Sequence, residues 1–119
     1  MIYVMPTPER HDTRTCNAAL TRAFQFLGKR WTGVLLASLT DGPASFTELK
    51  RAVVGISDSV LSDRLSDLTQ TGLAQRVVHE GPPVTIVYSL TTAGEALLPA
   101  MKELGDWASV NLPEQSPCT

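Results

Sequence analysis

The chain has 119 residues, 43% hydrophobic and 18% charged, which is enough apolar material for one core and too little length for two. This balance excludes a disordered chain, and no apolar run approaches the roughly 18 residues that a membrane span needs. The first residues lack the basic-then-apolar order of a signal peptide, so we expect a single domain in the cytoplasm.

Charge is unevenly distributed around a net value of −2. Residues 10–76 hold nine Lys and Arg against six Asp and Glu, whereas residues 77–119 hold one lysine against five acids. This asymmetry is mild and falls short of a strongly basic patch. A nucleic-acid contact, if present, is therefore expected in the first two thirds of the chain.

The first expected elements are two helices behind an N-terminal arm. Residues 1–14 contain two prolines and no periodicity, which predicts a flexible arm. Leu20, Phe24 and Leu27 give residues 17–28 the apolar stripe of a helix. A second stripe begins at Trp31 and ends before the turn signal of residues 40–43.

A helix-turn-helix pattern follows. Ser45 and Glu48 have the spacing of a capping box at the start of a short helix, which ends near Gly55. Ser57 is the expected N-cap of the next helix, which has a stripe of Leu61, Leu65 and Leu68 and stops at Gly72. Two short helices joined by a glycine-containing turn are typical of this motif.

A β-hairpin is expected directly after the second short helix. Residues 74–79 and 84–90 are rich in β-branched side chains, and the intervening Pro82 and Pro83 belong in a hairpin tip. The order helix, helix, helix-turn-helix and hairpin is that of a winged helix. We therefore predict a mainly α, α+β winged helix-turn-helix domain over residues 15–111.

The last predicted helix opens at a capping box of Thr92 and Glu95, with Pro99 kinking or restarting it, before a polar tail of residues 112–119. Its long apolar face exceeds what a small core can cover, so we predict a symmetric dimer interface shared with the first helix. The alternative is a terminal helix folded onto its own core. The predicted interface residues are Leu20, Phe24, Leu97, Met101, Leu104 and Trp107.

The second helix of the helix-turn-helix is expected to face DNA, although it carries three aspartates. Asp58 lies in the first turn, where the helix dipole compensates a carboxylate. Asp67 lies beyond the N-terminal half that reads bases and is expected to pair with Arg64. Asp63 alone points outward in that half, where a carboxylate accepts a hydrogen bond from cytosine. We therefore predict that Asp63 contributes specificity and not affinity.

Affinity is expected from Lys and Arg near the helix-turn-helix, because phosphate neutralisation supplies most of it. Lys50 and Arg51 are the strongest candidates, while Lys29 and Arg30 serve equally well as caps of the preceding helix. The wing carries Glu80 and no cation at its tip. The full set of predicted DNA contacts is Lys29, Arg30, Lys50, Arg51, Ser57, Ser59, Val60, Ser62, Asp63, Arg64, Arg76 and His79.

The two cysteines, Cys16 and Cys118, and the two histidines are scattered without the spacing of a zinc site. The sequence also lacks the GxGxxG, P-loop, GxSxG and HExxH patterns. We therefore expect no enzyme, no metal and no cofactor.

A string of short motifs resembles the HxlR-type bacterial transcription regulators, which are relatives of the MarR-like winged-helix group. It covers roughly residues 15–110 in order and spacing: Cys16, FLGKRW (26–31), LTDGP (39–43), FTEL (46–49), GIS (55–57), LSDRL (61–65), GL (72–73), YSLT (88–91) and Gly94. The resemblance implies a homodimeric regulator, with repression the expected mode, on a palindromic double-stranded DNA operator.

The resemblance also implies a possible sensor. Several members detect electrophiles or oxidants through a cysteine that Cys16 matches in position, and other members bind small ligands. A thiol at a helix N-terminus with Arg14 nearby is suited to this role, and Cys118 is a candidate partner. Three alternatives stay open: an inert Cys16, a regulator controlled by a ligand at the dimer interface, and a protein–protein module that binds no specific DNA.

Overall fold

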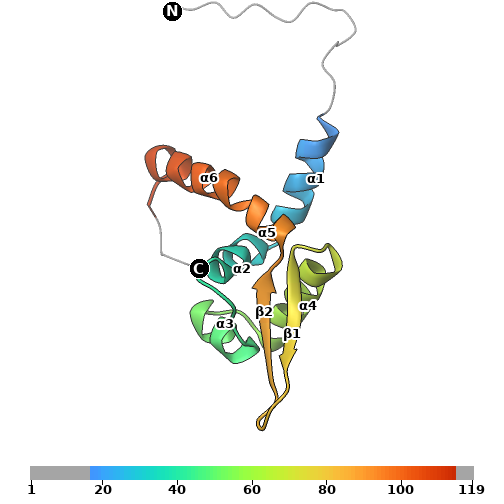
Figure 1. Cartoon of the computed structure of the whole chain (residues 1–119). Helices are drawn as coiled ribbons and strands as arrows, with labels where there is room; N and C mark the ends of the chain where they lie inside the picture. The colour runs from blue at the N-terminus through green and yellow to red at the C-terminus, as the bar shows by residue number, and fades with distance from the viewer. Residues whose placement is uncertain (1–16, 115–119) are drawn as a thin grey trace, which may run out of the picture.

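The computed structural model describes residues 17–114 (Figure 1). Six helices and a two-stranded antiparallel sheet follow one another in the predicted order within this range. They are α1 (Ala18–Leu27), α2 (Thr32–Leu39), α3 (Phe46–Ala52), α4 (Asp58–Gln70), β1 (Ala74–His79), β2 (Thr85–Leu90), α5 (Thr92–Ala96) and α6 (Leu98–Asn111). The mainly α winged helix-turn-helix prediction is confirmed. Among these helices none is both long and apolar enough to cross a membrane.

The core lies where α2, α3 and α4 meet the sheet. Its buried apolar side chains are Leu35, Leu36, Leu39, Leu49, Val53, Ile56, Leu61, Leu65, Leu68 and Ala74. The predicted stripe of α4, Leu61, Leu65 and Leu68, is confirmed by this set. The α2 stripe is wrong in part, because Leu36 and Thr32 are buried whereas Trp31 precedes the helix. An almost wholly apolar helix buried on several sides has no single face for periodicity to reveal.

The caps predicted for the helix-turn-helix are present. The Ser45 amide donates to Glu48 Oε1 at 2.8 Å, and the Glu48 amide donates to Ser45 Oγ at 3.1 Å. The bond from the Ser45 amide lowers the pKa of Glu48, because it stabilises the charged carboxylate. Ser57 Oγ accepts from the Val60 amide and starts α4, and Gly72 follows α4 with φ +81°. These residues set where both helices begin and where α4 stops.

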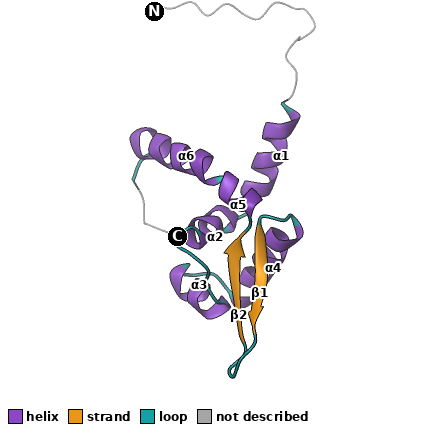
Figure 2. Ribbon diagram, viewed as in Figure 1, coloured by secondary structure: helices purple, strands orange, loops and turns teal. Residues whose placement is uncertain are grey.

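The hairpin projects from the helices as a wing (Figure 2). Its strands pair from Ala74 with Leu90 to His79 with Thr85. A further bridge, which no sequence pattern predicted, joins Ala44 and Tyr88 through two backbone hydrogen bonds of 2.8 and 2.9 Å. This bridge ties the segment before α3 to the outer edge of β2, so the wing and the helix-turn-helix form one unit.

Of two predictions about the C-terminal helices, one is corrected and one is confirmed. The N-cap of α5 is Thr91 and not Thr92, with Thr91 Oγ1 accepting from the Gly94 amide. Gly94 lies so close to the Leu73 carbonyl that a Cβ there would clash with the backbone. Pro99 occupies the first turn of a new helix, α6, which confirms the predicted restart. Proline is favoured there because those amides have no helical partner.

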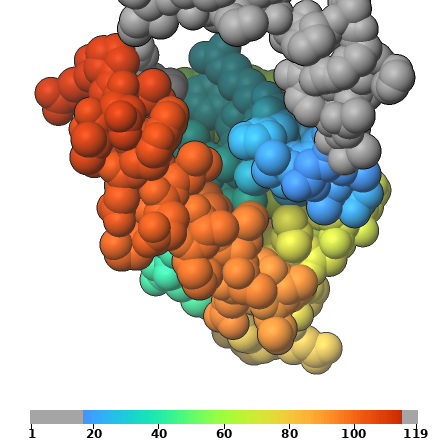
Figure 3. All heavy atoms as spheres, turned by 90° about the horizontal axis from the view of Figure 1, so that it is seen from above, coloured from blue at the N-terminus to red at the C-terminus, as the bar shows by residue number. Residues whose placement is uncertain are grey.

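α1 and α6 stand on the side of the domain opposite the wing (Figures 1 and 3). Neither helix contains a buried residue. Phe24 is 58% exposed and Trp107 is 53% exposed, and Leu20 and Leu104 are exposed to a similar degree. Leu97 and Met101, the other two predicted interface residues on this side of the chain, are partly buried against the chain's own core.

Candidate nucleic-acid interface

The outer side of the N-terminal half of α4 is short and polar. Ser59, Ser62 and Asp63 are exposed there, as predicted for a reading face. Ser57 has its Oγ occupied as the helix cap, although the residue remains exposed. Val60 is partly buried against the core, which leaves it less available for a base than the sequence suggested.

Asp58 is neutralised by a lysine from the preceding helix. Lys50 Nζ lies 3.4 Å from Asp58 Oδ1 and also donates to the Ile56 carbonyl at 2.6 Å. The Asp58 side chain is 77% exposed, so its compensation comes from this lysine as well as from the helix dipole. Lys50, a leading candidate for a phosphate contact, is therefore engaged across the turn between α3 and α4.

Asp67 is neutralised by two cations. Arg64 Nη1 lies 3.5 Å from Asp67 Oδ2, which confirms the predicted pair one turn apart. Lys29 Nζ, from the α1–α2 junction, lies 3.3 Å from the same oxygen. Arg64 is largely buried, and its Nε has no hydrogen-bond partner among the described residues. Lys29 and Arg64 are therefore committed to Asp67 and to the joint between α1 and α4.

Asp63 differs from the other two aspartates of α4. Its side chain is exposed and makes no ion pair or hydrogen bond with the part of the chain that the structure describes. The helix thus presents one uncompensated carboxylate on its outer face and not three. An isolated carboxylate disfavours phosphate, but it is able to accept a hydrogen bond from a base amino group.

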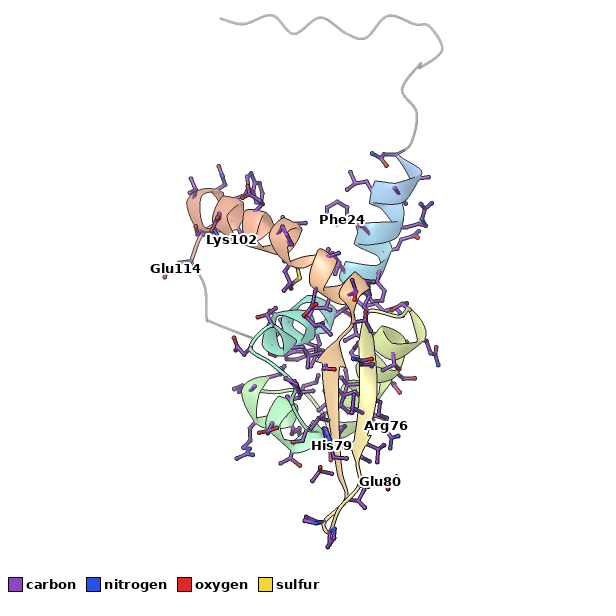
Figure 4. The ribbon with its side chains drawn as sticks, in the orientation of Figure 1. Phe24, Arg76, His79, Glu80, Lys102 and Glu114 are labelled. Atoms are coloured by element: carbon purple, nitrogen blue, oxygen red, sulfur yellow. The ribbon has the colours of Figure 1, made fainter. Side chains whose placement is uncertain are left out.

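Among the predicted contacts, four Arg and His residues remain exposed outside these ion pairs: Arg30, Arg51, Arg76 and His79. The guanidinium of Arg30 lies 4.7 Å from the centre of the Trp31 ring, an arrangement that orders the cation. Arg51 is on α3, beside the helix-turn-helix. Figure 4 shows Arg76 and His79 along β1 and Glu80 nearer the wing tip, where the residues flanking it are uncharged.

Trp31 connects the α1–α2 junction to the helix-turn-helix turn, a role that the sequence did not reveal. Its backbone is left-handed, with φ +79°, which is rare for an aromatic residue. The tip of its ring lies 3.6 Å from the position that a Cβ on Gly55 would take. Together with the Lys29–Asp67 pair, this contact joins the α1–α2 junction to the turn and to the last part of α4.

The proposed sensor residues Cys16 and Cys118 lie outside the described residues, as do the N-terminal arm and most of the tail. The residue after Cys16, Asn17, caps α1 by accepting from the Leu20 amide at 2.9 Å. Within residues 17–114, no group of three or more His, Cys, Asp and Glu side chains is placed to hold a metal ion.

The capped α3–turn–α4 unit, the polar outer face of α4 and the bridged hairpin define a winged helix-turn-helix protein. Residues 26–116 match the HxlR-like helix-turn-helix family, and the chain belongs to that family. It is accordingly a helix-turn-helix transcriptional regulator.

Known relatives agree with this assignment. The transcriptional regulator YodB of Bacillus subtilis is 40% identical over 86 residues, which span 72% of this chain and 77% of YodB. YtfH of Escherichia coli is 35% identical over 71% of this chain and 68% of its own length. The structure of reduced YodB superposes with a TM-score of 0.76 at 34% identity, covering 87% of this chain and all of that one. The structure of the redox regulator HypR in its reduced form superposes with a TM-score of 0.73 at 28% sequence identity. This superposition covers 78% of the present chain and 92% of the HypR chain.

Proposed function

We propose that the chain acts in the cytoplasm as a homodimeric repressor on a palindromic DNA operator, with α4 of each protomer in the major groove. The exposed polar face of α4, with Asp58 and Asp67 neutralised from outside the groove, is the observation that carries this proposal. Ser59, Ser62 and Asp63 then meet base edges, because reading helices use their N-terminal half.

Affinity in this proposal comes from cations outside the reading face. Arg51 on α3 and Arg76 on β1 are exposed and form no ion pair with another described residue, so they are available to phosphates. Arg30, ordered on the Trp31 ring, is a third candidate. The wing tip is uncharged apart from Glu80, so we assign it close contact with the backbone or minor groove and no phosphate neutralisation.

The dimer in this proposal is formed by the exposed apolar side chains of α1 and α6. Phe24 projects from α1 on the side that faces α6 (Figure 4), and Leu104 and Trp107 on α6 are half exposed. Such side chains are unfavourable in water and favour burial against a second copy. Symmetric pairing suits a palindrome, because operator symmetry mirrors protein symmetry.

Binding to two probes tests the proposed function. The first probe is the duplex that the wild-type protein enriches from a random-sequence library, called the selected duplex; the second has the same composition in shuffled order. We expect the selected duplex to bind at least about 1000-fold more tightly. Affinity for both probes should fall steeply with salt. Equal affinity for the two probes would support the alternative of a protein–protein module.

Asp63 should contribute to specificity. Asp63→Ala is expected to weaken binding to the selected duplex by about 5- to 150-fold, since a correct base contact carries roughly 1–3 kcal/mol. Binding to the shuffled duplex should tighten slightly, because a carboxylate facing phosphates is removed. Ser66→Ala, on the exposed side of α4 in its C-terminal half, is the matched control. Equal tightening on both probes would show that Asp63 only repels DNA.

We further propose that oxidation at Cys16 controls operator binding. In the sequence, Cys16 comes directly before Asn17, the N-cap of α1, and helix N-termini in general favour thiolates. The structure of YodB is known in reduced, diamide-treated and quinone-bound forms, and that of HypR in reduced and oxidised forms. These structures of two relatives support redox control as a proposal for the present chain. Control by a ligand at the dimer interface is the competing hypothesis.

Diamide or a quinone should weaken binding to the selected duplex by about 5- to 150-fold, the usual range of coupling between two sites. Cys16→Ser should bind normally and lose this response. Cys118→Ser tells whether the second thiol is the oxidation partner, since it abolishes the response only in that case. A wild-type protein whose affinity ignores oxidant would show that Cys16 does not control binding.

A further inference from the structure

Lys50 spans the turn of the helix-turn-helix. Its ammonium donates to the Ile56 carbonyl at 2.6 Å, six residues ahead, and lies 3.4 Å from Asp58 Oδ1 in the first turn of α4. The two contacts join the last turn of α3 to the last part of the turn and to the start of the reading helix. Ile56 is itself buried in the core, so the lysine holds a fixed point.

The same contacts make Lys50 a poor phosphate ligand. A lysine ammonium has three donors; one of them is bonded to the Ile56 carbonyl, and the ion pair with Asp58 lies beside the other two. A phosphate approaching the remaining donors would also approach Asp58, which is 77% exposed and of like charge. Arg51, the next residue along α3, is exposed and forms no ion pair within the described residues; its charge acts on Glu48, one turn back on α3, and helps to lower the pKa of that carboxyl.

Fixing α4 against α3 matters for reading DNA, because displacements of about 1 Å in a positioned group are costly to recognition. α3 crosses the DNA backbone in this motif while α4 enters the groove. The turn between them contains Gly55 at φ +95°, a residue that imposes little stiffness of its own. A cation that bridges the turn supplies the constraint that glycine does not.

We infer that Lys50 is a positioning residue for the reading helix and does not neutralise a DNA phosphate. This inference rests on the proposed function and assigns Arg51 the phosphate contact on α3. Lys50 sets the angle at which α4 meets base edges, so its removal impairs sequence-specific binding and leaves general DNA binding intact.

The test compares Lys50→Met with Arg51→Met, a matched pair that removes one charge each and keeps most of the aliphatic stem. Affinities for the selected and shuffled duplexes are measured over a range of salt concentrations, at a temperature where circular dichroism shows the variants folded. Lys50→Met should weaken binding to the selected duplex roughly tenfold, as for the loss of a charged hydrogen bond. Its affinity for the shuffled duplex and its salt slope should not change.

Arg51→Met should instead weaken both duplexes alike and reduce the salt slope by about 0.9 for each phosphate that is no longer neutralised. The same pattern in Lys50→Met would overturn the inference. A Lys50→Met protein that melts earlier but discriminates the two duplexes as the wild type does would also overturn it, because the role would then be merely structural.

Asp58→Asn provides a second variant, which keeps the bond from Lys50 to the Ile56 carbonyl. Asp58→Asn should lower the ratio of the affinity for the selected duplex to that for the shuffled duplex, but by less than Lys50→Met does. If Lys50→Met does not fold, Asp58→Asn decides the matter, and an unchanged ratio in that variant would count against the inference. A wild type that fails to distinguish the duplexes would overturn the proposed function and this inference with it. Discrimination in the wild type that persists in the variants would overturn the inference alone.

Discussion

Trp107→Glu should convert the protein to a monomer and weaken binding to the selected duplex by about 100-fold or more. Trp107 is half exposed on α6, about one turn from the half-exposed Leu104, and Phe24 projects from α1 on the side that faces α6. A carboxylate in this apolar surface would be buried without a partner in a dimer, at a cost that a dimer interface does not tolerate. A monomer engages one half-site only and forgoes the 10²- to 10⁴-fold tightening that a second, linked half-site provides.

Ser109→Glu is the control for this variant. It places the same carboxylate two residues along α6, about 200° around the helix, on a polar side. Sedimentation equilibrium should show a dimer for the wild type and for Ser109→Glu, and a monomer for Trp107→Glu. A monomeric wild type, or a dimer that survives Trp107→Glu, would contradict the α1–α6 interface.

Leu65→Ala should cost about 2–5 kcal/mol of unfolding free energy, the usual range for a buried leucine. Leu65 is 1% exposed and lies at the centre of the α4 stripe, against the core beneath the reading face. Small domains have only about 5–15 kcal/mol of net stability, so we expect a large fall in melting temperature and the loss of DNA binding near 37 °C. Chemical denaturation at fixed protein concentration measures the change, since dimerisation also contributes.

Ser66→Ala on the same helix should change the unfolding free energy by no more than about 0.5 kcal/mol, because Ser66 is exposed and only accepts a weak bond from Gln70. A Leu65→Ala protein as stable as Ser66→Ala would mean that the side of α4 facing the core is not the one described. The reading face would then have to be reassigned as well.

Sequence patterns predicted the elements because local chemistry determines where they start and stop. Ser45, Glu48, Ser57 and Gly72 act within a few residues of themselves, and all four do so in the structure. The apolar stripe of α4 was also predictable from the sequence, because one side of that helix is buried and the other is exposed. Pro99 predicted the break before α6 for the same local reason.

Sequence patterns did not predict the contacts between segments that are far apart in the chain. The Lys29–Asp67 pair joins residues 38 apart, and the Ala44–Tyr88 bridge joins residues 44 apart; no periodicity encodes either contact. The sequence predicted Lys50 as a cation that contacts DNA. Its contacts across the turn, with the Ile56 carbonyl and Asp58, depend on how α3 and α4 are oriented, which no local pattern predicts. The assignment of the α5 cap to Thr92 failed because Thr91 and Thr92 are adjacent and equally suited to capping.

The acidic character of α4 has a simple physical resolution. Two of its three aspartates are held by lysines from other elements, Asp58 by Lys50 and Asp67 by Lys29, and Arg64 adds to the second pair. These ion pairs help to fix the position of α4, and they reduce the negative charge that Asp58 and Asp67 would otherwise add to the side of α4 that faces DNA. In the proposed function, recognition and affinity are therefore separated: the outer face of α4 reads sequence, and Arg51 and Arg76 attract the backbone.

The sequence of the duplex that the wild type enriches from a random library tests the proposed reading of DNA by α4 most directly. We predict an inverted repeat whose half-site centres are about 34 Å apart along the DNA, one helical turn, because two α4 helices related by a dyad enter successive major grooves. A library that emerges without any enriched sequence would contradict the claim that α4 reads DNA.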